Sequence, residues 1–564
     1  MAGECRPPPA TGRFRPGQVD PYDEQPYTGL MPSAAPLRPV LRLLPRSTGA
    51  RAFLVAFLGF FLLGAAWSVA LPYDGSPDEF RHVVRAYGVV DGQIAARADA
   101  QVTVPKSLVP PGAGDADEDS CTRWKLDVSA ACLGSPAPGD ESRRVVTTSG
   151  AANYNPLYYA VIGWPLKLSP TFGGVIAARL LTCLLTSALL AGAAAVAVRL
   201  ARGRGPLVLG GVLLAVTPVV LNLAGAVNPA GPEIAAGVAV WTALIAILLA
   251  GDDSKWTLAL FGLGAGALVV LRELGIGWLV AALVVVAFGA RRERLAELAR
   301  RPAVRLWAAL VAAAAVFGAA WILLSTQGGI PTAGKTTTAI PQGTALLVKE
   351  LTHRVPFYTS GLVGLTSYGD VAIPFPLTLA WFAAVGALLI AVARRAGWRV
   401  LLQLAAIVGG GYVFLVGADL QAAAGGWWFS QGRYALPLLV GAPILAGYVA
   451  ADRGLVTVPR QVSTMRWAVW VLIPTQAVAL WITMLRYEHA FTSRHPNLFF
   501  LFSQTPSVNP FSGPWTPPGA AVPAVLLGVA GTVALLTFAL RATGPGPISD
   551  VDSVTIRERY IRIS

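Results

Sequence analysis

Long apolar segments, separated by short polar ones, recur along most of the chain. Most of them are about as long as a helix must be to cross the roughly 30 Å hydrocarbon core of a bilayer. The pattern predicts an all-α polytopic membrane protein with about 12 transmembrane helices. We expect the spans at 52–72, 175–198, 207–225, 234–250, 256–271, 274–290, 303–324, 376–393, 399–417, 434–450, 467–486 and 521–540. Two of these, 256–271 and 274–290, are short, and a single kinked hairpin is the alternative for that pair.

Composition agrees with this class. Hydrophobic residues make up 54% of the 564 residues and charged residues only 13%, whereas a soluble domain carries about 25% charged residues. The balance excludes an ordinary soluble enzyme, and it equally excludes a disordered chain.

The formal net charge of +14 raises the question of a nucleic-acid partner. The basic residues, however, do not form one face but alternate with the spans. All of the clusters fall on one side if the N-terminus is cytoplasmic, as the positive-inside rule requires. They lie at Arg38–Arg51, Arg199–Arg204, Lys255, Arg291–Arg301, Arg394–Arg399, Arg453–Arg466 and Arg541. The charge therefore mostly encodes topology, with both termini cytoplasmic, and we expect no nucleic-acid partner.

This topology divides the chain into three parts. Residues 1–50, rich in Pro, Gly and Arg and without a signal-peptide core, are expected to be a disordered cytoplasmic arm. Residues 51–541 form the transmembrane domain, whose first span is an uncleaved anchor. Residues 542–564 form a cytoplasmic tail.

Two large extracytoplasmic loops are predicted, at 73–174 and 325–375. The first loop is acidic, with 12 Asp and Glu against eight Lys and Arg between 73 and 152. It contains Cys121 and Cys132, which can form a disulfide outside the membrane. A metal site needs more ligands than two cysteines, and the chain has only four His. No cofactor is therefore predicted; a divalent metal is possible but not implied.

The end of the first loop, 153–168, is rich in aromatic residues. Counting it as a span would reverse the topology of everything downstream. We expect an interfacial helix instead, with Tyr158, Tyr159 and Trp164 at headgroup depth.

The chain leaves the first span with the sequence YDGSPDEFRHVVRAYGVVDGQ, which contains the first candidate site. Ser76 is the expected helix cap and Pro77 lies in the first turn. Asp78 and Glu79 would then lie at the positive end of the helix dipole. A carboxylate pair there can take a proton from an acceptor hydroxyl. The alternative is a capped, solvated helix start.

Cationic side chains follow on the same helix. Helical spacing places Arg81 and His82 on the face of Asp78, with Arg85 one turn further. These side chains can hold a phosphate leaving group, or they can form ordinary ion pairs along the helix.

Further candidates lie at the ends of later spans. Asn228 begins the sequence NPAGPE, which could instead be a tight turn. Arg272 separates the two short spans and, like Arg179, is costly if it faces lipid, so pairing or snorkelling is expected. Arg433 and Tyr434, in SQGRYALPLL, suit a lipid phosphate or pyrophosphate, with an aromatic-belt anchor as the alternative.

One apparent nucleotide motif is rejected. Residues 329–336, GIPTAGKT, match the phosphate-loop pattern GxxxxGK[ST]. That pattern binds ATP only between a strand and a helix of a nucleotide-binding fold, whereas this segment follows a membrane span.

Five motifs in order carry a resemblance to a known family. They are PDEFRHVVRAYGVVDGQ, NPLYY followed by AARLL, NPAG, GLVGLTSYGD and QGRYALPLL. Together they resemble a bacterial family of multi-pass membrane proteins of unassigned function, across about residues 70–540. The first motif departs by one place, because His82 follows Glu79 by three residues.

That family looks like a branch of the GT-C superfamily of glycosyltransferases, which use sugars linked to polyprenyl phosphate. The resemblance implies a GT-C-like fold with an acidic catalytic residue after the first span and an interfacial helix. Asp78 becomes the general base, Glu79 its partner or substitute, and Arg433 the phosphate ligand, with Arg85 or Arg272 assisting. No separate DxD element is present, so the resemblance does not imply a metal.

The expected function is transfer of a sugar from a polyprenyl-phosphate donor to a cell-envelope glycan, lipid or protein acceptor on the extracytoplasmic face. The alternatives are a non-catalytic transporter or flippase for lipid-linked sugars and an assembly partner. A transporter commonly shows internal repeats, and no repeat is evident in the sequence.

Overall fold

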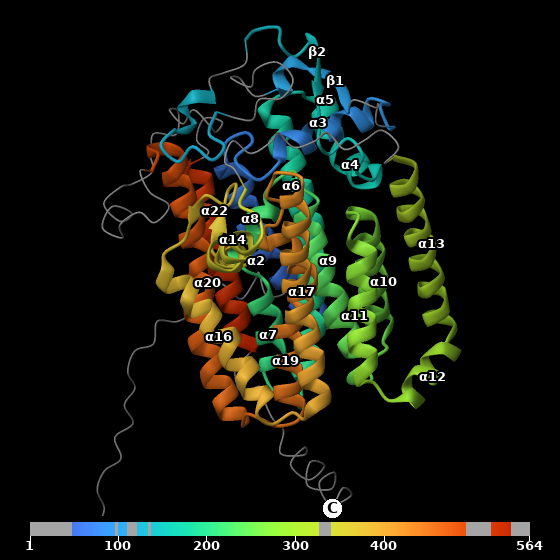
Figure 1. Cartoon of the computed structure of the whole chain (residues 1–564). Helices are drawn as coiled ribbons and strands as arrows, with labels where there is room; N and C mark the ends of the chain where they lie inside the picture. The colour runs from blue at the N-terminus through green and yellow to red at the C-terminus, as the bar shows by residue number, and fades with distance from the viewer. Residues whose placement is uncertain are drawn as a thin grey trace, which may run out of the picture. The chain divides into compact units, whose positions relative to one another are not determined.

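The apolar segments fold into helices that run side by side in one bundle (Figure 1). In this computed structural model the described residues are 48–95, 100–109, 121–133, 137–325, 340–491 and 521–542. The principal helices are α2 (Thr48–Ala70), α6 (Phe172–Ala201), α7 (Leu207–Ala215), α8 (Pro218–Ala224), α9 (Ala230–Leu244), α10 (Lys255–Leu271), α11 (Gly275–Gly289), α13 (Pro302–Ser325), α16 (Phe375–Ala393), α17 (Trp398–Ala424), α19 (Gly441–Asp452), α20 (Val458–His489) and α22 (Ala521–Ala542).

The described residues contain nine helical segments that are long and apolar enough to span a membrane, and a tenth if the bent pair α7–α8 is one span. Helices α10 and α11 are apolar but shorter. Each of the twelve predicted segments is thus helical, and the protein is an all-α polytopic membrane protein. The predicted arm up to residue 47, the tail after 542 and the phosphate-loop pattern at 329–336 lie outside the described residues.

The prediction of one continuous span at 207–225 is wrong in its detail. Helices α7 and α8 meet at an angle of 59°. Pro218 begins α8, and proline both lacks an N–H and excludes the preceding residue from helical geometry. Thr217 accordingly adopts an extended conformation, with ψ 165°.

Helix α9 forms the centre of the bundle. It contacts α6, α10, α11 and α19, and all of its residues are buried. Helix α13, in contrast, packs mainly on α10 and has only two buried residues, Val311 and Gly318. The remaining surface of α13 is apolar, as expected for a helix that faces lipid.

A small folded region lies at one end of the bundle, which we call the loop end (Figure 1). It contains α3 (Glu79–Val90), α4 (Pro156–Ile162), α5 (Trp164–Leu168) and the antiparallel pair β1 (Gln101–Pro105) and β2 (Arg144–Thr148), with Gln101 opposite Thr148. Helix α3 buries Phe80, Val83, Val84 and Tyr87, spaced at helical periodicity, against α4, α5 and β1. This packing fixes the position of the segment that begins at Asp78.

The predicted interfacial segment 153–168 forms two short helices, α4 and α5, that meet at Gly163. Leu157, Val161, Trp164 and Leu168 are exposed and form an apolar stripe suited to a membrane surface. Tyr158 and Tyr159 are buried instead. They bond to Thr182 of α6 and His82 of α3 and so face protein and not lipid, while their depth in the membrane stays a prediction.

A second loop region connects α13 to α16. It contains α14 (Thr344–Lys349), the π-helical turn η5 (Glu350–Arg354), α15 (Val355–Gly361) and a short hairpin of β3 (Leu365–Thr366) and β4 (Val371–Ala372). A 3-10 turn, η6 (Gly432–Ala435), and the short α18 (Leu436–Leu439) precede α19.

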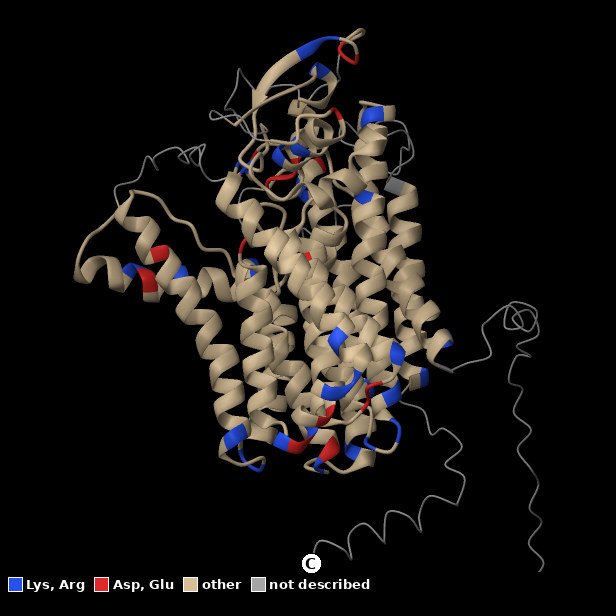
Figure 2. Cartoon of the chain, turned by 90° about the vertical axis from the view of Figure 1, so that its right-hand side faces the viewer, with Lys and Arg blue, Asp and Glu red and all other residues tan. Residues whose placement is uncertain are grey.

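Basic residues lie at both ends of the bundle (Figure 2). Those of the short connecting loops lie opposite the loop end, where several pair with acidic residues, as Arg204 does with Asp452 at 2.6 Å.

Candidate functional site

Asp78 stands at the start of α3 in an uncommon backbone conformation. Its φ of 59° and ψ of 13° are left-handed, and its side chain makes no capping hydrogen bond. Only a few per cent of non-glycine residues adopt this conformation, with aspartate among the favoured types. The carboxylate of Asp78 is thereby turned away from the helix end and is available to other groups.

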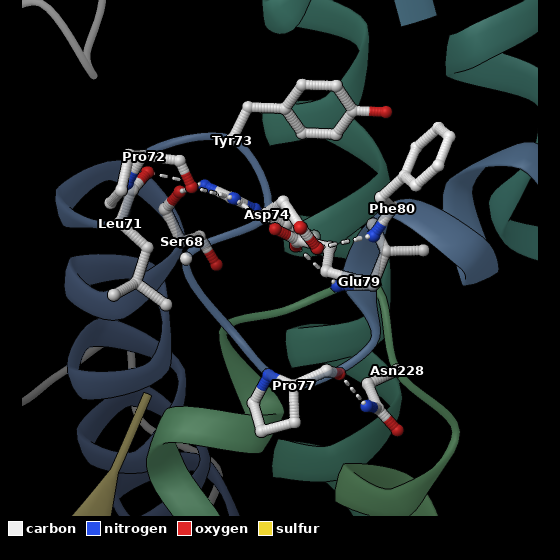
Figure 3. Close-up of polar contacts among 12 residues, drawn as sticks. Ser68, Leu71, Pro72, Tyr73, Asp74, Pro77, Glu79, Phe80 and Asn228 are labelled. Atoms are coloured by element: carbon white, nitrogen blue, oxygen red, sulfur yellow. Dashed lines mark hydrogen bonds and ion pairs between the residues drawn. The ribbon is translucent and has the colours of Figure 1, made fainter. Parts of the chain in front are cut away.

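The predicted cap at Ser76 is wrong. Helix α3 begins at Glu79, and the carboxylate Oδ1 of Asp74 accepts the N–H of Phe80 at 2.9 Å (Figure 3). Burial raises the pKa of Asp74 to about 7, although hydrogen bonds from Tyr368 and Phe80 oppose that shift. The cap was missed because Asp74 lies six residues before Phe80, outside the usual capping spacing.

Two arginines hold the Asp78 carboxylate. Arg433 Nη2 lies 3.1 Å from Asp78 Oδ2, and Arg123 Nη2 lies 3.7 Å from Oδ1. The side chain of Asp78 is 38% exposed. Partial burial would raise the pKa of Asp78, but the charges of Arg433 and Arg123 outweigh it and lower the pKa below its usual range. Asp78 is therefore ionised at neutral pH.

Arg433 lies in η6, 355 residues from Asp78 in the sequence. Its Nη1 donates to Gln431 Oε1, and its guanidinium carbon lies 5.0 Å from the centre of the Tyr434 ring. The structure thus brings the two motifs at 78 and 433 together.

A second cation, Arg272, faces the same tyrosine. Its guanidinium carbon lies 5.2 Å from the centre of the Tyr434 ring. It pairs with Glu233 at 3.3 Å and donates to the Tyr154 hydroxyl at 3.4 Å. Arginines from two different elements therefore contact the ring of Tyr434. Cation–π attraction to this one ring holds both guanidinium groups in the same part of the site.

His82 is buried beside these groups. Its Nδ1 lies 2.8 Å from the Tyr159 hydroxyl. Burial lowers the pKa of His82 to about 3, with nearby Arg272 and Arg433 lowering it further against the opposing effect of Asp78. His82 is therefore neutral at physiological pH, so it can share a hydrogen bond but cannot supply the positive charge that the sequence suggested.

Glu79 has a different partner from Asp78, the fully buried Arg179, and lies between the end of α2 and Asn228 (Figure 3). Its two carboxylate oxygens accept from Arg179, Oε1 from Nε at 2.7 Å and Oε2 from Nη2 at 2.5 Å, and both side chains are fully buried. Arg179 also donates to the carbonyls of Ser68, Leu71 and Pro72. This bidentate pair ties α3 to α6 and to the end of α2, so Glu79 has a structural position.

Two other candidate residues, Asn228 and Arg85, also donate hydrogen bonds to backbone carbonyls. Asn228 donates from Nδ2 to the carbonyl of Pro77 at 2.7 Å, while its Oδ1 accepts the N–H of Ala230 (Figure 3). Arg85 donates to the carbonyls of Gln93, Ile94 and Tyr154. Asn228 thereby fixes the turn before Asp78, and Arg85 fixes the far side of α3.

The first loop carries a disulfide between Cys121 and Cys132, with a Cα–Cα distance of 6.2 Å. Inside this short loop is Arg123, whose guanidinium carbon lies 4.9 Å from the centre of the Tyr368 ring. From α20, Arg486 donates to the carbonyls of Thr122, Lys125 and Val128. These contacts hold Arg123 next to Asp78. Sequence reasoning missed Arg123 and Arg486, because nothing in their local sequence distinguishes them.

The assembled site contains the partly exposed Asp78 carboxylate, the guanidinium groups of Arg123, Arg272 and Arg433, and the rings of Tyr154, Tyr368 and Tyr434 that these arginines contact. Within the described residues, no three His, Cys, Asp or Glu side chains come together in a way that could hold a metal ion. The residues of the site can carry out acid–base chemistry at Asp78 and bind an anion through the arginines.

Comparison with known proteins identifies the family. Residues 61–442 match the family described as "Predicted membrane protein (DUF2142)". The chain belongs to this family. The matched region includes α3, the NPAG turn and η6, and the family resemblance inferred from the five motifs is confirmed.

Two solved structures are similar to the chain. One is ArnT from Cupriavidus metallidurans in the apo state, with 13% identity, a TM-score of 0.37, and coverage of 88% of this chain and 78% of that chain. The other is ArnT from the same organism bound to undecaprenyl phosphate, with 15% identity, a TM-score of 0.37, and coverage of 90% and 78%. No protein of curated function matches the chain. Similarity at this level does not transfer an activity from ArnT to DUF2142 proteins.

Proposed function

We propose that this DUF2142 protein is a membrane glycosyltransferase that moves a sugar from a polyprenyl-phosphate donor to a cell-envelope acceptor. The observation that carries the proposal is the pairing of the partly exposed Asp78 carboxylate with Arg433 at the loop end of an apolar bundle. A base and a phosphate-binding cation side by side are what glycosyl transfer from a phosphate requires.

In the proposed reaction, Asp78 accepts the proton of the acceptor hydroxyl. The acceptor oxygen bonds to the anomeric carbon, and the bond from that carbon to the phosphate oxygen breaks. Its electron pair remains on the phosphate, whose added negative charge is stabilised by Arg433 and Arg272. Preorganised cations at a developing charge commonly supply a large part of the catalysis.

The low pKa of Asp78 in the free protein fits this sequence of events. Arg433 and Arg123 together lower that pKa, against the effect of burial. When a phosphate engages Arg433, the attraction between Arg433 and Asp78 is shared, while the effect of burial remains. The pKa of Asp78 therefore rises on donor binding, and the carboxylate becomes a stronger base.

Two features support the proposed membrane placement. The basic residues of the short connecting loops lie opposite the loop end (Figure 2), which favours an extracytoplasmic loop end under the positive-inside rule. The disulfide between Cys121 and Cys132 suits an oxidising compartment. The apolar stripe on α4 and α5 would then lie on the outer leaflet of a bacterial plasma membrane, at the depth of a lipid phosphate.

One observation favours the alternative of a transporter or flippase for lipid-linked sugars. The break between α7 and α8 resembles the discontinuous helices of transporters. The buried ionisable residues of the described spans nevertheless lie within about two turns of the loop end, at Arg179, Glu233, Asp419 and Arg486. A surface-facing enzyme accounts for that distribution better than a midplane carrier.

Transfer activity tests the proposal. Membranes containing wild-type protein or Asp78→Asn are supplied with labelled polyprenyl-phosphoryl sugars, and label in envelope acceptors is measured. Loss of a general base is expected to lower the rate by roughly 10²- to 10⁴-fold. Asp91→Asn is the matched control, because Asp91 lies at the other end of α3 and pairs with Arg144 and Lys167.

Full activity of Asp78→Asn, at equal amounts in the membrane, would contradict the assignment of the base. Movement of the labelled lipid from one leaflet of the vesicle membrane to the other, without transfer of the sugar, would instead support the flippase alternative.

A further inference from the structure

A small pocket lies beside Arg433, between α8 and the second loop region. Its volume is about 20 Å³, enough for a water molecule or one small polar group. The wall from α8 consists of Val219, Asn222 and Leu223, which share a helix face at spacings of three and four. The opposite wall includes Phe357, Ser367, Gln431 and Arg433.

Asn222 is an unusual residue in this wall. It is only 1% exposed, in a helix that is otherwise apolar. Among the described residues, its amide Nδ2 has no hydrogen-bond partner. An unpartnered buried donor is costly and is rare in folded proteins. A group inside the pocket that accepts a hydrogen bond would remove this cost.

The break between α7 and α8 explains how Asn222 reaches the pocket. Helix α8 turns by 59° from α7 after Thr217. The face of α8 that carries Asn222 therefore does not continue a face of α7 but meets the second loop region. A straight span at 207–225 would have no reason to carry a buried amide at this position.

Donors outnumber acceptors in the pocket. Asn222 offers the two N–H groups of its amide and one carbonyl acceptor, Oδ1, and Arg433 offers only donors, so a hydroxyl group, which both accepts and donates, fits this set. The Ser367 hydroxyl is already bonded to Tyr487 at 2.5 Å. The occupant that fits is an oxygen acceptor, either neutral or anionic, and a cationic ammonium group is disfavoured by Arg433.

We propose that this pocket receives a hydroxyl or hydroxymethyl group of the sugar whose phosphate Arg433 binds, and that Asn222 selects for it. The inference rests on the proposed function, because Arg433 links the two: its Nη2 reaches Asp78, and the same side chain lines the pocket. Because Arg433 and Asn222 line the same pocket, a donor bound by its phosphate at Arg433 can place its sugar against Asn222. Asn222 is then a specificity residue, and it does not take part in the proton transfer.

The test measures binding of defined probes to the purified full chain in nanodiscs. The probes are farnesyl phosphate and a panel of farnesyl-phosphoryl monosaccharides with glucose, galactose or arabinose. We expect at least one glycosylated probe to bind more tightly than farnesyl phosphate. In Asn222→Leu that gain, roughly three- to tenfold for a hydrogen bond of ordinary strength, is lost, while the affinity for farnesyl phosphate is unchanged.

Gln403→Leu is the matched control. Gln403 is a buried amide whose Nε2 donates to the carbonyl of Val285, joining α17 to α11 away from the site. It should keep the sugar-dependent gain. Asn222→Ala removes the same donors with less steric change, so it replaces Asn222→Leu if the leucine variant does not fold.

The outcomes separate the two proposals. A gain that persists in both Asn222 variants overturns the inference and leaves the proposed function intact. Equal binding of all probes by the wild type also overturns it, because the pocket then holds only water. If farnesyl phosphate does not bind, or binds equally well when Arg433 is replaced, the proposed function itself is contradicted.

Discussion

Replacing Arg179 by leucine tests whether the buried pair with Glu79 is structural. The guanidinium makes two hydrogen bonds to Glu79 and three to the carbonyls of Ser68, Leu71 and Pro72, at 2.5–2.9 Å. Arg179→Leu removes all five. Among the described residues, the fully buried Glu79 carboxylate then keeps one hydrogen bond, from the N–H of Val227 at 3.0 Å.

The magnitude follows from this geometry. Removing one partner of a buried ion pair costs about 3–5 kcal/mol, because the other charge stays buried without compensation. The three buried carbonyls lose their donor as well. We therefore expect a loss of at least about 3 kcal/mol, a large part of the roughly 5–15 kcal/mol that stabilises a typical protein.

The assay is the apparent unfolding temperature of purified protein in one detergent, at a fixed heating rate since unfolding of such proteins is often irreversible. A fall of several degrees is expected for Arg179→Leu. Adding Glu79→Leu removes the stranded charge, so the double variant should recover part of the loss. Arg204→Leu is the control, because its pair with Asp452 is partly exposed and should contribute about 1 kcal/mol or less.

An Arg179→Leu protein as stable as the wild type, or a double variant no better than the single one, would refute this reasoning. Glu79 would then be free for a catalytic role.

Three further predictions concern the surroundings of Asp78. Because the pKa of Asp74 is raised to about 7, the folded state binds the proton of this carboxyl more tightly than the unfolded state does. The stability of the wild type should therefore fall as the pH rises from about 4 to 7. In a pH series of unfolding temperatures, Asp74→Asn should flatten this dependence. Replacing Cys121 and Cys132 by serine should cost about 2–4 kcal/mol locally. Loosening Arg123 from Asp78 should also raise the pKa of Asp78, which shifts the pH profile of transfer; an unchanged profile would contradict that role of Arg123. Arg433→Lys keeps the charge but loses the planar fork, so farnesyl phosphate affinity should fall about tenfold, and an equal affinity would show that charge alone suffices.

Much of the fold could be predicted from the sequence, because the length and apolarity of each span are local properties. All twelve predicted segments are helical, including the short ones that became α10 and α11. The bend at Thr217–Pro218 also has a local signal, proline, but apolar residues on both sides of it obscured the break.

The site was only partly predictable. Asp78 and Arg433 stood out because they lie next to a span on the side that the sequence predicts to be extracytoplasmic, and the structure places them 3.1 Å apart. The sequence could not separate Asp78 from Glu79, since their directions depend on the left-handed backbone at Asp78 and on Arg179, 100 residues further along the chain. For the same reason Arg85 and Asn228 resembled ligands for a substrate, whereas they bind backbone carbonyls.

Arg123 and Asn222 carried no usable signal at all. Arg123 reaches Asp78 through the fold of a disulfide loop held by Arg486. Asn222 becomes distinctive only when the bend of α8 buries its amide against a pocket. Contacts between elements that are distant in the sequence determine both positions.

The central claim is that Arg433 and Asp78 form a site for a polyprenyl phosphate. The most direct measurement is an experimental structure of the full chain with a polyprenyl phosphate added. The account predicts phosphate density within hydrogen-bond distance of Arg433 and beside Asp78, with the lipid chain leaving along the loop end. Lipid bound instead in the apolar cavity lined by Leu213, Trp381 and Leu472, with no density at Arg433, would contradict it.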